Sequence, residues 1–406
     1  MRPRNTPDAD RRMALAREWD QLVDQVRGLP GFADFLRPPR LETLLPAAAG
    51  GPVVILNVSR WRCDALIVRT SGVEVVELRH LTSEGVAAQA QAYLTAVGAR
   101  QRATERGEGR RDLAPAGDEA RVEGPLDDCL RWMWEAFARE LLDHLGHAAP
   151  PVPGEPWPRV WWCPTGLLTL LPIHAAGDHR TPGAAVLDRV VSSYTPTLRA
   201  LREARQHTAG SGRMLFVGMP ATPGQADLPN VRVEEELIGH HFTETPTRLV
   251  GRQATRDAVL RALSEHDWVH FACHGEQNLA DPSRGGLLLH DGPLTVTDLG
   301  SRQYRGEFAY LSGCKTAVGG RRLPDEAITL AAALHYTGYR HVIATLWSVW
   351  DEQAAEIARD VYTALVRDGV PDARPAARAL HHAVRRLRTA HPDRPSMWTP
   401  FAHTGP

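Results

Sequence analysis

The chain has 406 residues, enough for two or three domain-sized cores, and its 47 basic and 48 acidic residues leave a formal net charge of −1. This balance does not indicate a nucleic-acid-binding face or a role at a membrane surface, so we expect neither nucleic acid nor membrane as a partner. The sequence holds no apolar run of about 18 residues, and its charged N-terminus lacks the apolar segment of a signal peptide. Five scattered cysteines without metal-ligand spacing favour reduced thiols and a cytoplasmic location.

The first part of the chain combines helix and strand patterns. Apolar residues at helical spacing predict a helix over residues 11–27, and further helices are predicted over 84–97 and 126–146. Between these last two, residues 100–124 are charged and poor in large apolar side chains, which predicts an exposed, mobile loop. Three apolar runs predict a hairpin or meander: 52–59, 63–70 and 71–78.

From residue 158 onward, short apolar strands alternate with helices. The predicted strands are 159–164, 190–196, 213–220, 267–274, 307–314 and 340–347. The predicted helices are 254–264, 325–337, 352–367 and 374–389. Nearly continuous apolar strands separated by helices are typical of a mostly parallel sheet covered on both faces. The sequence therefore predicts an α/β fold of two tandem halves, 46–210 and 211–406, with a short N-terminal helical extension over 1–45.

The stretch FAYLSGCKTAVGG, residues 308–320, raises a question of chemistry. It contains Lys315, the only lysine in the chain, directly after Cys314. A phosphate-binding loop needs G-x-x-x-x-G-K-[ST], and here a cysteine stands where the second glycine belongs, so that interpretation fails. No dinucleotide fingerprint and no G-x-S-x-G motif occurs either, and we expect no cofactor.

Cys314 also suits a nucleophile, because it follows a strand at the edge where catalytic groups collect in open α/β sheets. The strand ending in His274-Gly275 is of the same kind, and if the two strands are neighbours, His274 can take the proton of the Cys314 thiol. The backbone N–H of Gly275 would then face the developing oxyanion. The alternatives are a buried structural cysteine and a structural histidine, and spacing alone leaves them open.

Metal binding is the other use of such residues. His270, Cys273 and His274 lie close in sequence, but in a strand Cys273 points to the opposite face from both histidines. We therefore predict no metal site.

Beyond single motifs, ordered blocks of sequence resemble a known family. The blocks WVHFACHG, GGLLLHDGPLTVTDL, FAYLSGCKTA, LPDEAITLAAALHYTGYRHVIATLWSVWD and SMWTPFAHTGP are similar to successive blocks of the CHAT domain. Upstream, PVVILNVSRWRCDALIV, WWCPTGLLTLLPIHAAG and VVSSYTPTLRALREAR extend the resemblance back to about residue 50. CHAT domains are caspase-like, are related to separase, and are often attached to tetratricopeptide repeats.

The resemblance implies a caspase-like fold and a Cys/His protease dyad, carried here by Cys314 and His274. It also implies an oxyanion hole formed by Gly275 and the Cys314 amide. The half over 46–210 corresponds to a catalytically empty companion, and it has Cys163 at a strand end without a strand-terminal His-Gly before it.

Two features depart from the family's pattern. The family usually has Ala before the cysteine and often Glu after it, where this chain has Gly313 and Lys315, and the lysine changes the charge beside the thiol. No repeat with a period near 34 residues precedes the match.

The expected function is that of a cytosolic cysteine endopeptidase that cleaves a specific protein, with a regulatory protein as a further partner. The alternative is a catalytically silent scaffold for protein interactions. Relatives are often encoded beside their targets, including gasdermin-like proteins in bacteria, so the resemblance makes a neighbouring gene's product a candidate substrate and bacterial defence a candidate role.

Substrate specificity points to an acidic residue. In separase-type proteases a block similar to LWSVWDEQ contributes an acid that binds the substrate's basic residue, which here is Asp351. The alternative is that Asp351 caps the helix that begins at Glu352, in which case Asp325 or Asp281 would supply the acid.

Overall fold

The structure is a computed structural model that describes residues 7–30, 32, 35–105, 116–207, 210–276, 281–312, 329–347, 349 and 351–406. The chain divides into two compact units, Met1–Pro46 and Ala47–Pro406. In the first unit, helix α1 (Pro7–Arg27) contains the helix predicted over 11–27 and is followed by the short α2 (Leu41–Leu44) and by the 3-10 turn η1 (Leu45–Ala48). The amide of Gly28 donates to the carbonyl oxygens of Asp24 and Gln25, which ends α1 where the sequence predicts.

The second unit is built on one eleven-stranded sheet, whose strands lie in the order β3-β2-β1-β4-β5-β16-β13-β12-β8-β6-β7. In chain order the strands are β1 (Val53–Asn57), β2 (Asp64–Arg69), β3 (Gly72–Glu77), β4 (Arg159–Pro164), β5 (Val191–Tyr194), β6 (Met214–Gly218), β7 (Thr247–Val250), β8 (Trp268–Ala272), β12 (Phe308–Leu311), β13 (His341–Thr345) and β16 (Phe401–Thr404). Each of the nine predicted strands is present. Strands β7 and β16 lie outside the predicted set.

Most strand pairs in this sheet are parallel. Strands β1, β4, β5 and β16 form one parallel group, and β13, β12, β8, β6 and β7 form another. Strand β16 meets β13 in antiparallel register, and β1, β2 and β3 form the predicted meander. The α/β fold with a mostly parallel sheet is therefore confirmed, and a single sheet runs through both parts of the unit.

The seam between the two parallel groups carries buried polar side chains. His341 on β13 and His403 on β16 place Nδ1 and Nε2 3.1 Å apart. The other ring nitrogen of His403 lies 2.8 Å from the hydroxyl of Ser193 on β5. Burial lowers the pKa of both histidines well below its usual value, so the two rings are neutral at physiological pH.

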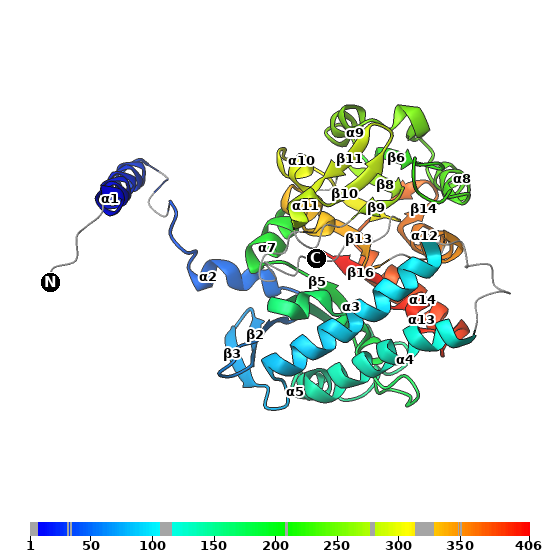
Figure 1. Cartoon of the computed structure of the whole chain (residues 1–406), viewed down its shortest axis with the longest axis horizontal. Coiled ribbons are helices and arrows are strands. Elements are labelled where there is room, and N and C mark those ends of the chain that lie inside the picture. The colour runs from blue at the N-terminus through cyan, green and yellow to red at the C-terminus, as the bar shows by residue number, and fades with distance from the viewer. Residues whose placement is uncertain are drawn as a thin grey trace. The chain divides into compact units, whose positions relative to one another are not determined.

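Helices cover both faces of the second strand group (Figure 1). Alternate strand residues enter two separate cores, as Trp268 and Val269 do on β8. The core that contains Trp268 is closed by α8 (Val231–His241), α12 (Asp351–Leu365) and α13 (Ala376–Ala390). The core that contains Val269 is closed by α9 (Arg256–Leu263), α10 (Val296–Gly300) and α11 (Leu330–Tyr336).

The first strand group is covered by α3 (Ser83–Glu105), α4 (Ala116–Met133), the π-helical turn η2 (Trp134–Ala138) and α5 (Arg139–His144), with α3 and α4 side by side (Figure 1). The loop predicted over 100–124 is therefore wrong at both ends. Helix α3 continues to Glu105 and α4 begins at Ala116, while residues 106–115 lie outside the described residues. Both extensions are rich in Ala, Arg, Glu and Gln, which are strong helix formers, so local propensity outweighs the lack of large apolar side chains.

The remaining elements are short. They are η3 (Gly166–Leu170), η4 (Ile173–Ala175), α6 (Val186–Arg189), α7 (Leu198–Gln206), η5 (Gly251–Gln253), β9 (Gly275–Glu276), η6 (Pro282–Arg284), β10 (Gly286–Leu289), β11 (Gly292–Thr295), β14 (Val366–Arg367), β15 (Val370–Pro371) and α14 (Pro395–Trp398). Strands β9, β10 and β11 form a separate antiparallel sheet that begins directly after His274. Across the described ranges, none of the helices combines the length and the apolar character needed to cross a lipid bilayer.

Candidate active site

The strands that lead to the predicted dyad are neighbours in the sheet, which is the condition that the sequence sets for such a dyad. Strand β12 pairs with β8 in parallel register, with Leu311 opposite Phe271. The amide of Ser312 continues this ladder by donating to the carbonyl oxygen of Phe271 at 2.8 Å. His274 therefore lies just past the carboxyl end of β8, on the edge of the sheet at which β12 also ends.

The ring of His274 is half-buried and fixed by one hydrogen bond. Its Nε2 lies 2.7 Å from the backbone carbonyl oxygen of Ala226. A carbonyl oxygen can only accept, so Nε2 carries the proton, and in the neutral ring Nδ1 keeps a lone pair. The contact thus holds the ring in the tautomer whose Nδ1 can act as a base.

The loop between β6 and α8 presents the carbonyl group of Ala226. Within this loop the amide of Leu228 donates to the carbonyl oxygen of Pro220 at 2.9 Å, and the amide of Gln225 donates to Thr222 at 3.1 Å. Gly224 has a φ of +76°, a left-handed conformation that glycine adopts without strain. These contacts fold the loop back on itself and bring Ala226 over the end of β8.

A buried polar cluster lies beneath this edge. Glu234 of α8 is 2% exposed, and its Oε2 lies 2.5 Å from Nε2 of His270, which is fully buried on β8. Its other oxygen accepts a hydrogen bond of 2.9 Å from the hydroxyl of Ser312. Nδ1 of His270 lies 3.1 Å from the hydroxyl of Tyr362 on α12. The cluster therefore joins β8, β12, α8 and α12 through one carboxyl group and one imidazole.

Aromatic side chains hold the imidazole of this cluster in place. The ring of His270 stacks on Tyr310, with centroids 5.0 Å apart, and on Phe216, with centroids 5.5 Å apart. Burial raises the pKa of Tyr362 well above its usual value, so the hydroxyl that faces His270 stays protonated. His270 cannot turn toward solvent without breaking these contacts.

Glu234 and Ser312 are site residues that were not predicted from the sequence. A signal was present, because Glu234 shares the buried face of α8 with Val231 and Ile238 at helical spacing. A carboxyl group on an apolar helix face requires a buried partner. The identity of that partner depends on tertiary contacts that no local pattern contains.

A small cavity of about 20 Å³ separates the buried cluster from His274. Glu234, Ser312 and His274 line it together with apolar side chains from α8 and α12. The structure therefore brings His274 and the buried cluster to one place. Among the described residues, the cavity thus connects the buried polar side chains with the strand end that carries the predicted base His274.

The other predicted site residues are only partly described. Cys314 and Asp325 lie outside the described residues. Gly275 is half-buried and begins β9, where it pairs with Leu287 of β10. Asp351 is the first residue of α12, one position earlier than predicted, and its side chain lies outside the description. Asp281, the other alternative for the specificity acid, is exposed just before η6 and accepts a hydrogen bond from Ser283 at 2.6 Å.

Two of the described cysteines are poorly suited to nucleophilic chemistry. Cys163 at the end of β4 is 7% exposed, and its thiol donates to the carbonyl oxygen of Pro196 at 3.5 Å. Burial raises the pKa of Cys163 to about 12 and that of Cys129 also to about 12. Both thiols therefore stay protonated at neutral pH, and the thiolate is the reactive form.

His270 and Cys273 lie on opposite sides of the sheet. Cys273 packs in the core closed by α9, α10 and α11, whereas His270 faces α8 and α12 on the other side of the sheet. Within the described ranges, no group of three or more His, Cys, Asp or Glu residues is arranged to hold a metal ion.

Two solved structures of separase align with most of this chain. The chain aligns with separase in the separase–securin complex of Saccharomyces cerevisiae at a TM-score of 0.62 and 9% identity, covering 89% of this chain and 30% of separase. A second structure of that complex gives a TM-score of 0.56 at 10% identity, covering 90% of this chain and 30% of separase. The complex of the pro- and mature domains of RgpB from Porphyromonas gingivalis aligns at a TM-score of 0.43 and 11% identity. The alignment covers 72% of this chain and 77% of the RgpB chain. This chain thus spans about 30% of the length of separase.

At such low identity the likeness to separase establishes the fold, which is that of caspase-like cysteine peptidases. No curated protein matches the sequence. The CHAT domain matches residues 127–406, which is well over half of the chain and includes β8, β12 and both positions of the predicted dyad. The chain therefore belongs to the CHAT domain family.

Proposed function

We propose that the chain is a cysteine endopeptidase that cleaves a specific protein, with Cys314 as the nucleophile and His274 as the general base. The observation that supports this most directly is the hydrogen bond from Nε2 of His274 to Ala226, which leaves Nδ1 as the basic nitrogen at the end of β8. Cys314 follows Leu311 by three residues, and His274 follows Phe271, the register partner of Leu311, by three residues. In the proposal the thiol and the imidazole therefore lie at matching positions, just past the ends of the neighbouring strands β12 and β8.

The proposed reaction begins when Nδ1 of His274 takes the proton of the Cys314 thiol. The thiolate attacks the carbonyl carbon of the scissile peptide, and the backbone N–H groups of Gly275 and Cys314 donate to the resulting oxyanion. His274 then returns its proton to the leaving amine, which releases the first product and leaves an acyl-enzyme. Water, deprotonated by the same ring, hydrolyses the thioester and restores the thiol.

Two of the four described cysteines, Cys129 and Cys163, support Cys314 by contrast, because they are buried and their pKa values are raised to about 12. Lys315 adds a positive charge directly after Cys314, which favours the thiolate. The proposed location is the cytoplasm, and a gasdermin-like or other product of a neighbouring gene is the first substrate to examine. Separase crystallised with securin, so a regulatory protein partner is proposed here too.

The chemical test is selective alkylation. A low concentration of an iodoacetamide probe at pH 7 should label Cys314 ahead of the other four cysteines, as read by peptide mass mapping. His274→Ala should reduce the labelling rate by about tenfold or more, because it removes the proton acceptor. His240→Ala, an exposed histidine on α8, serves as the matched control and should leave the rate unchanged. Equal labelling of the wild type and His274→Ala would favour the alternative, a catalytically silent interaction scaffold.

Specificity is proposed to depend on an acid that binds a basic substrate residue before the cleaved bond. Asp351 is the first choice because α12 begins there, directly after the segment that follows β13, and β13 lies beside β12. A peptide library should show a preference for Arg that Asp351→Asn abolishes. If Asp351→Asn retains the preference, Asp325→Asn and Asp281→Asn are the next variants. An apolar preference in the wild type would refute an acidic specificity residue while leaving the dyad intact.

A further inference from the structure

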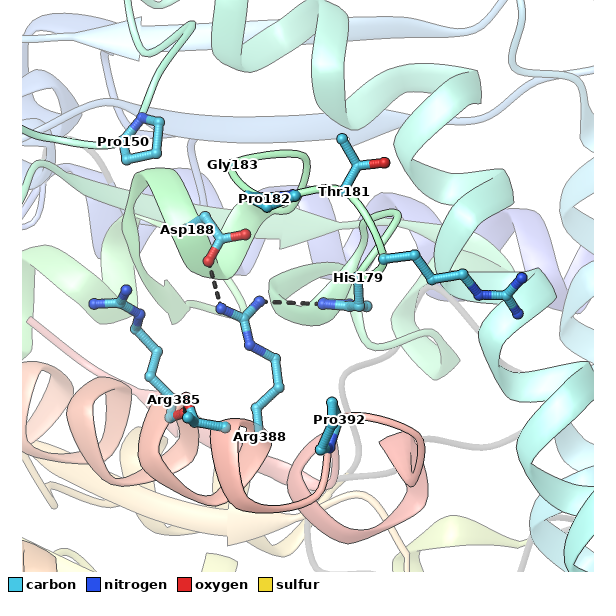
Figure 2. Close-up of a pocket in the computed structure, with 11 residues that line it drawn as sticks. Pro150, His179, Thr181, Pro182, Gly183, Asp188, Arg385, Arg388 and Pro392 are labelled. Carbon is cyan, nitrogen blue, oxygen red and sulfur yellow. Dashed lines mark hydrogen bonds and ion pairs between the residues drawn. The ribbon is translucent and has the colours of Figure 1, made fainter.

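A second hollow lies between α13 and the segment that joins η4 to α6 (Figure 2). Its volume is about 350 Å³, which is in the size range of pockets that bind small molecules. Of its charged lining residues, three are arginines (Arg180, Arg385 and Arg388) and one is an aspartate (Asp188). It shares no lining residue with the cavity beside His274.

Arg388 is held by partners inside the pocket. Its guanidinium forms an ion pair with Asp188 of α6, and its Nη1 lies 3.1 Å from Nδ1 of His179 (Figure 2). Nε2 of His179 donates to the carbonyl oxygen of Ala175 at 2.8 Å, so Nδ1 accepts the hydrogen bond from Arg388. Burial lowers the pKa of His179 to about 4, and the ring is therefore neutral. Asp188 and His179 thus fix Arg388 as one wall of the pocket.

Arg385 stands one helical turn before Arg388 and lacks such partners. Its guanidinium lies over the ring of Trp157, 4.5 Å from the centroid, and forms no ion pair with a described residue. Its Nε is buried and has no hydrogen-bond partner among the described residues. Burial lowers the pKa of Arg385, although the nearby Asp188 opposes this shift and Arg388 adds to it. An anion beside the end of this side chain would offset a partly buried positive charge.

The rest of the pocket fits an anion with an organic body. Arg180 at the rim is 77% exposed and shares its charge with Asp127, to which it donates at 2.9 Å. Because the one aspartate in the lining is already paired with Arg388, the pocket keeps an excess of positive charge. Pro150, Pro182 and Pro392 add apolar surface around the arginines (Figure 2).

We propose that this pocket, here called the arginine pocket, binds a small organic anion through the guanidinium of Arg385, with Arg388 as the fixed second donor. The planar guanidinium suits phosphate and carboxylate groups alike, since both accept two parallel hydrogen bonds. Trp157 keeps the Arg385 guanidinium in position beneath the ligand. The proposal stands apart from the peptidase activity, because it depends on neither His274 nor Cys314.

The test uses the full chain and three probes: AMP, pyrophosphate and citrate. Each is titrated by calorimetry at constant ionic strength, and the shift of the melting temperature is followed in parallel. At least one probe should bind with a dissociation constant below about 1 mM. Arg385→Gln should weaken that binding about tenfold or more, because it removes a charged hydrogen-bond donor. Arg378→Gln, the same change at an exposed position of α13 outside the pocket, should weaken binding less than about twofold.

The outcomes separate the ligand classes and the alternatives. Binding of AMP or pyrophosphate without citrate assigns a phosphate group, and binding of citrate alone assigns a carboxylate. If Arg385→Gln has a lower melting temperature than the wild type, Arg385→Lys is the second variant. It keeps the positive charge but lacks the planar guanidinium group, so it should still weaken binding. The proposal is overturned if no probe binds at about 10 mM, or if the two glutamine variants weaken binding equally, which would indicate general attraction to a cationic surface.

Discussion

Replacement of Glu234 provides the sharpest physical test of the buried cluster beneath His274. In the wild type, one carboxyl group serves both His270 at 2.5 Å and the hydroxyl of Ser312 at 2.9 Å. Glu234→Ala leaves both groups without this partner inside a core in which water is excluded. Loss of one member of such a buried pair is destabilising by about 3–5 kcal/mol, a large part of a typical folding free energy of about 5–15 kcal/mol.

Glu234→Gln separates charge from shape. The amide keeps the volume of the side chain and one acceptor oxygen, but it satisfies only one of the two partners as an acceptor. A neutral hydrogen bond is roughly half as strong as a charge-assisted one, so we expect a loss of about 1–2 kcal/mol. Glu236→Ala, on the exposed side of α8, is the matched control and should stay within about 0.5 kcal/mol of the wild type.

The assay is urea unfolding followed by tryptophan fluorescence, with circular dichroism as a second probe of the same transition. A double-mutant cycle with His270→Phe then measures the coupling, because phenylalanine preserves the stacking on Tyr310 and removes the ring nitrogens. Glu234→Ala should be much less destabilising in the His270→Phe background. The reasoning is wrong if Glu234→Ala alters stability by less than about 1 kcal/mol, or by the same amount in both backgrounds.

Three further predictions rest on other parts of the fold. Burial lowers the pKa of His174 to about 4, below its value of about 6.5 in the unfolded chain. The contribution of this ring to the free energy of unfolding should therefore be complete above about pH 6.5 and fall as the pH drops toward 4, with a loss of about 2 kcal/mol at pH 5. A melting temperature that stays constant from about pH 8 to 5 would contradict this. Gly405→Ala should destabilise by about 2 kcal/mol or more in thermal melts, because Gly405 has a φ of +126° and an added Cβ would lie 2.2 Å from a backbone oxygen. Gly300→Ala, in open space at the end of α10, is the control and should stay within about 0.5 kcal/mol of the wild type. Cys163→Ser should leave the total thiol reactivity at pH 7 unchanged in alkylation assays, because burial keeps that thiol protonated.

The sequence predicts the central strands well because their signal is local. Continuous apolar runs such as those of β8 and β12 are recognised without knowledge of their neighbours, and the alternation of helices and strands is enough to predict that they pair in parallel. Strand β16 was missed because Phe401–Thr404 is only four residues long and includes a histidine. The His403 ring is satisfied only by Ser193 and His341, more than 60 residues away, so the strand is defined by tertiary contacts.

In the candidate site, too, some features follow from local sequence patterns and others depend on tertiary contacts. The strand pattern predicts that His274 lies at a strand end, and the structure adds that β12 is the neighbour of β8. Glu234 lies 36 residues before His270 on a different element, and Ala226 is a carbonyl group in a loop without a motif. Contacts of this kind depend on how the β6–α8 segment packs over the sheet. Local propensity contains no information about them.

The direction of the strands also bears on how the two parts of the sheet divide their roles. Strands β4, β5 and β16 run parallel to one another, and β16 runs antiparallel to β13, which is parallel to β12 and β8. The carboxyl end of β4, with Cys163, therefore lies at the opposite edge of the sheet from the carboxyl end of β8, with His274. Because side chains at opposite strand ends cannot share one reaction centre, Cys163 is separated from His274 by topology as well as by its raised pKa. In the proposed dyad the nucleophile comes from the second group instead, because β12, the parallel neighbour of β8, leads directly to Cys314.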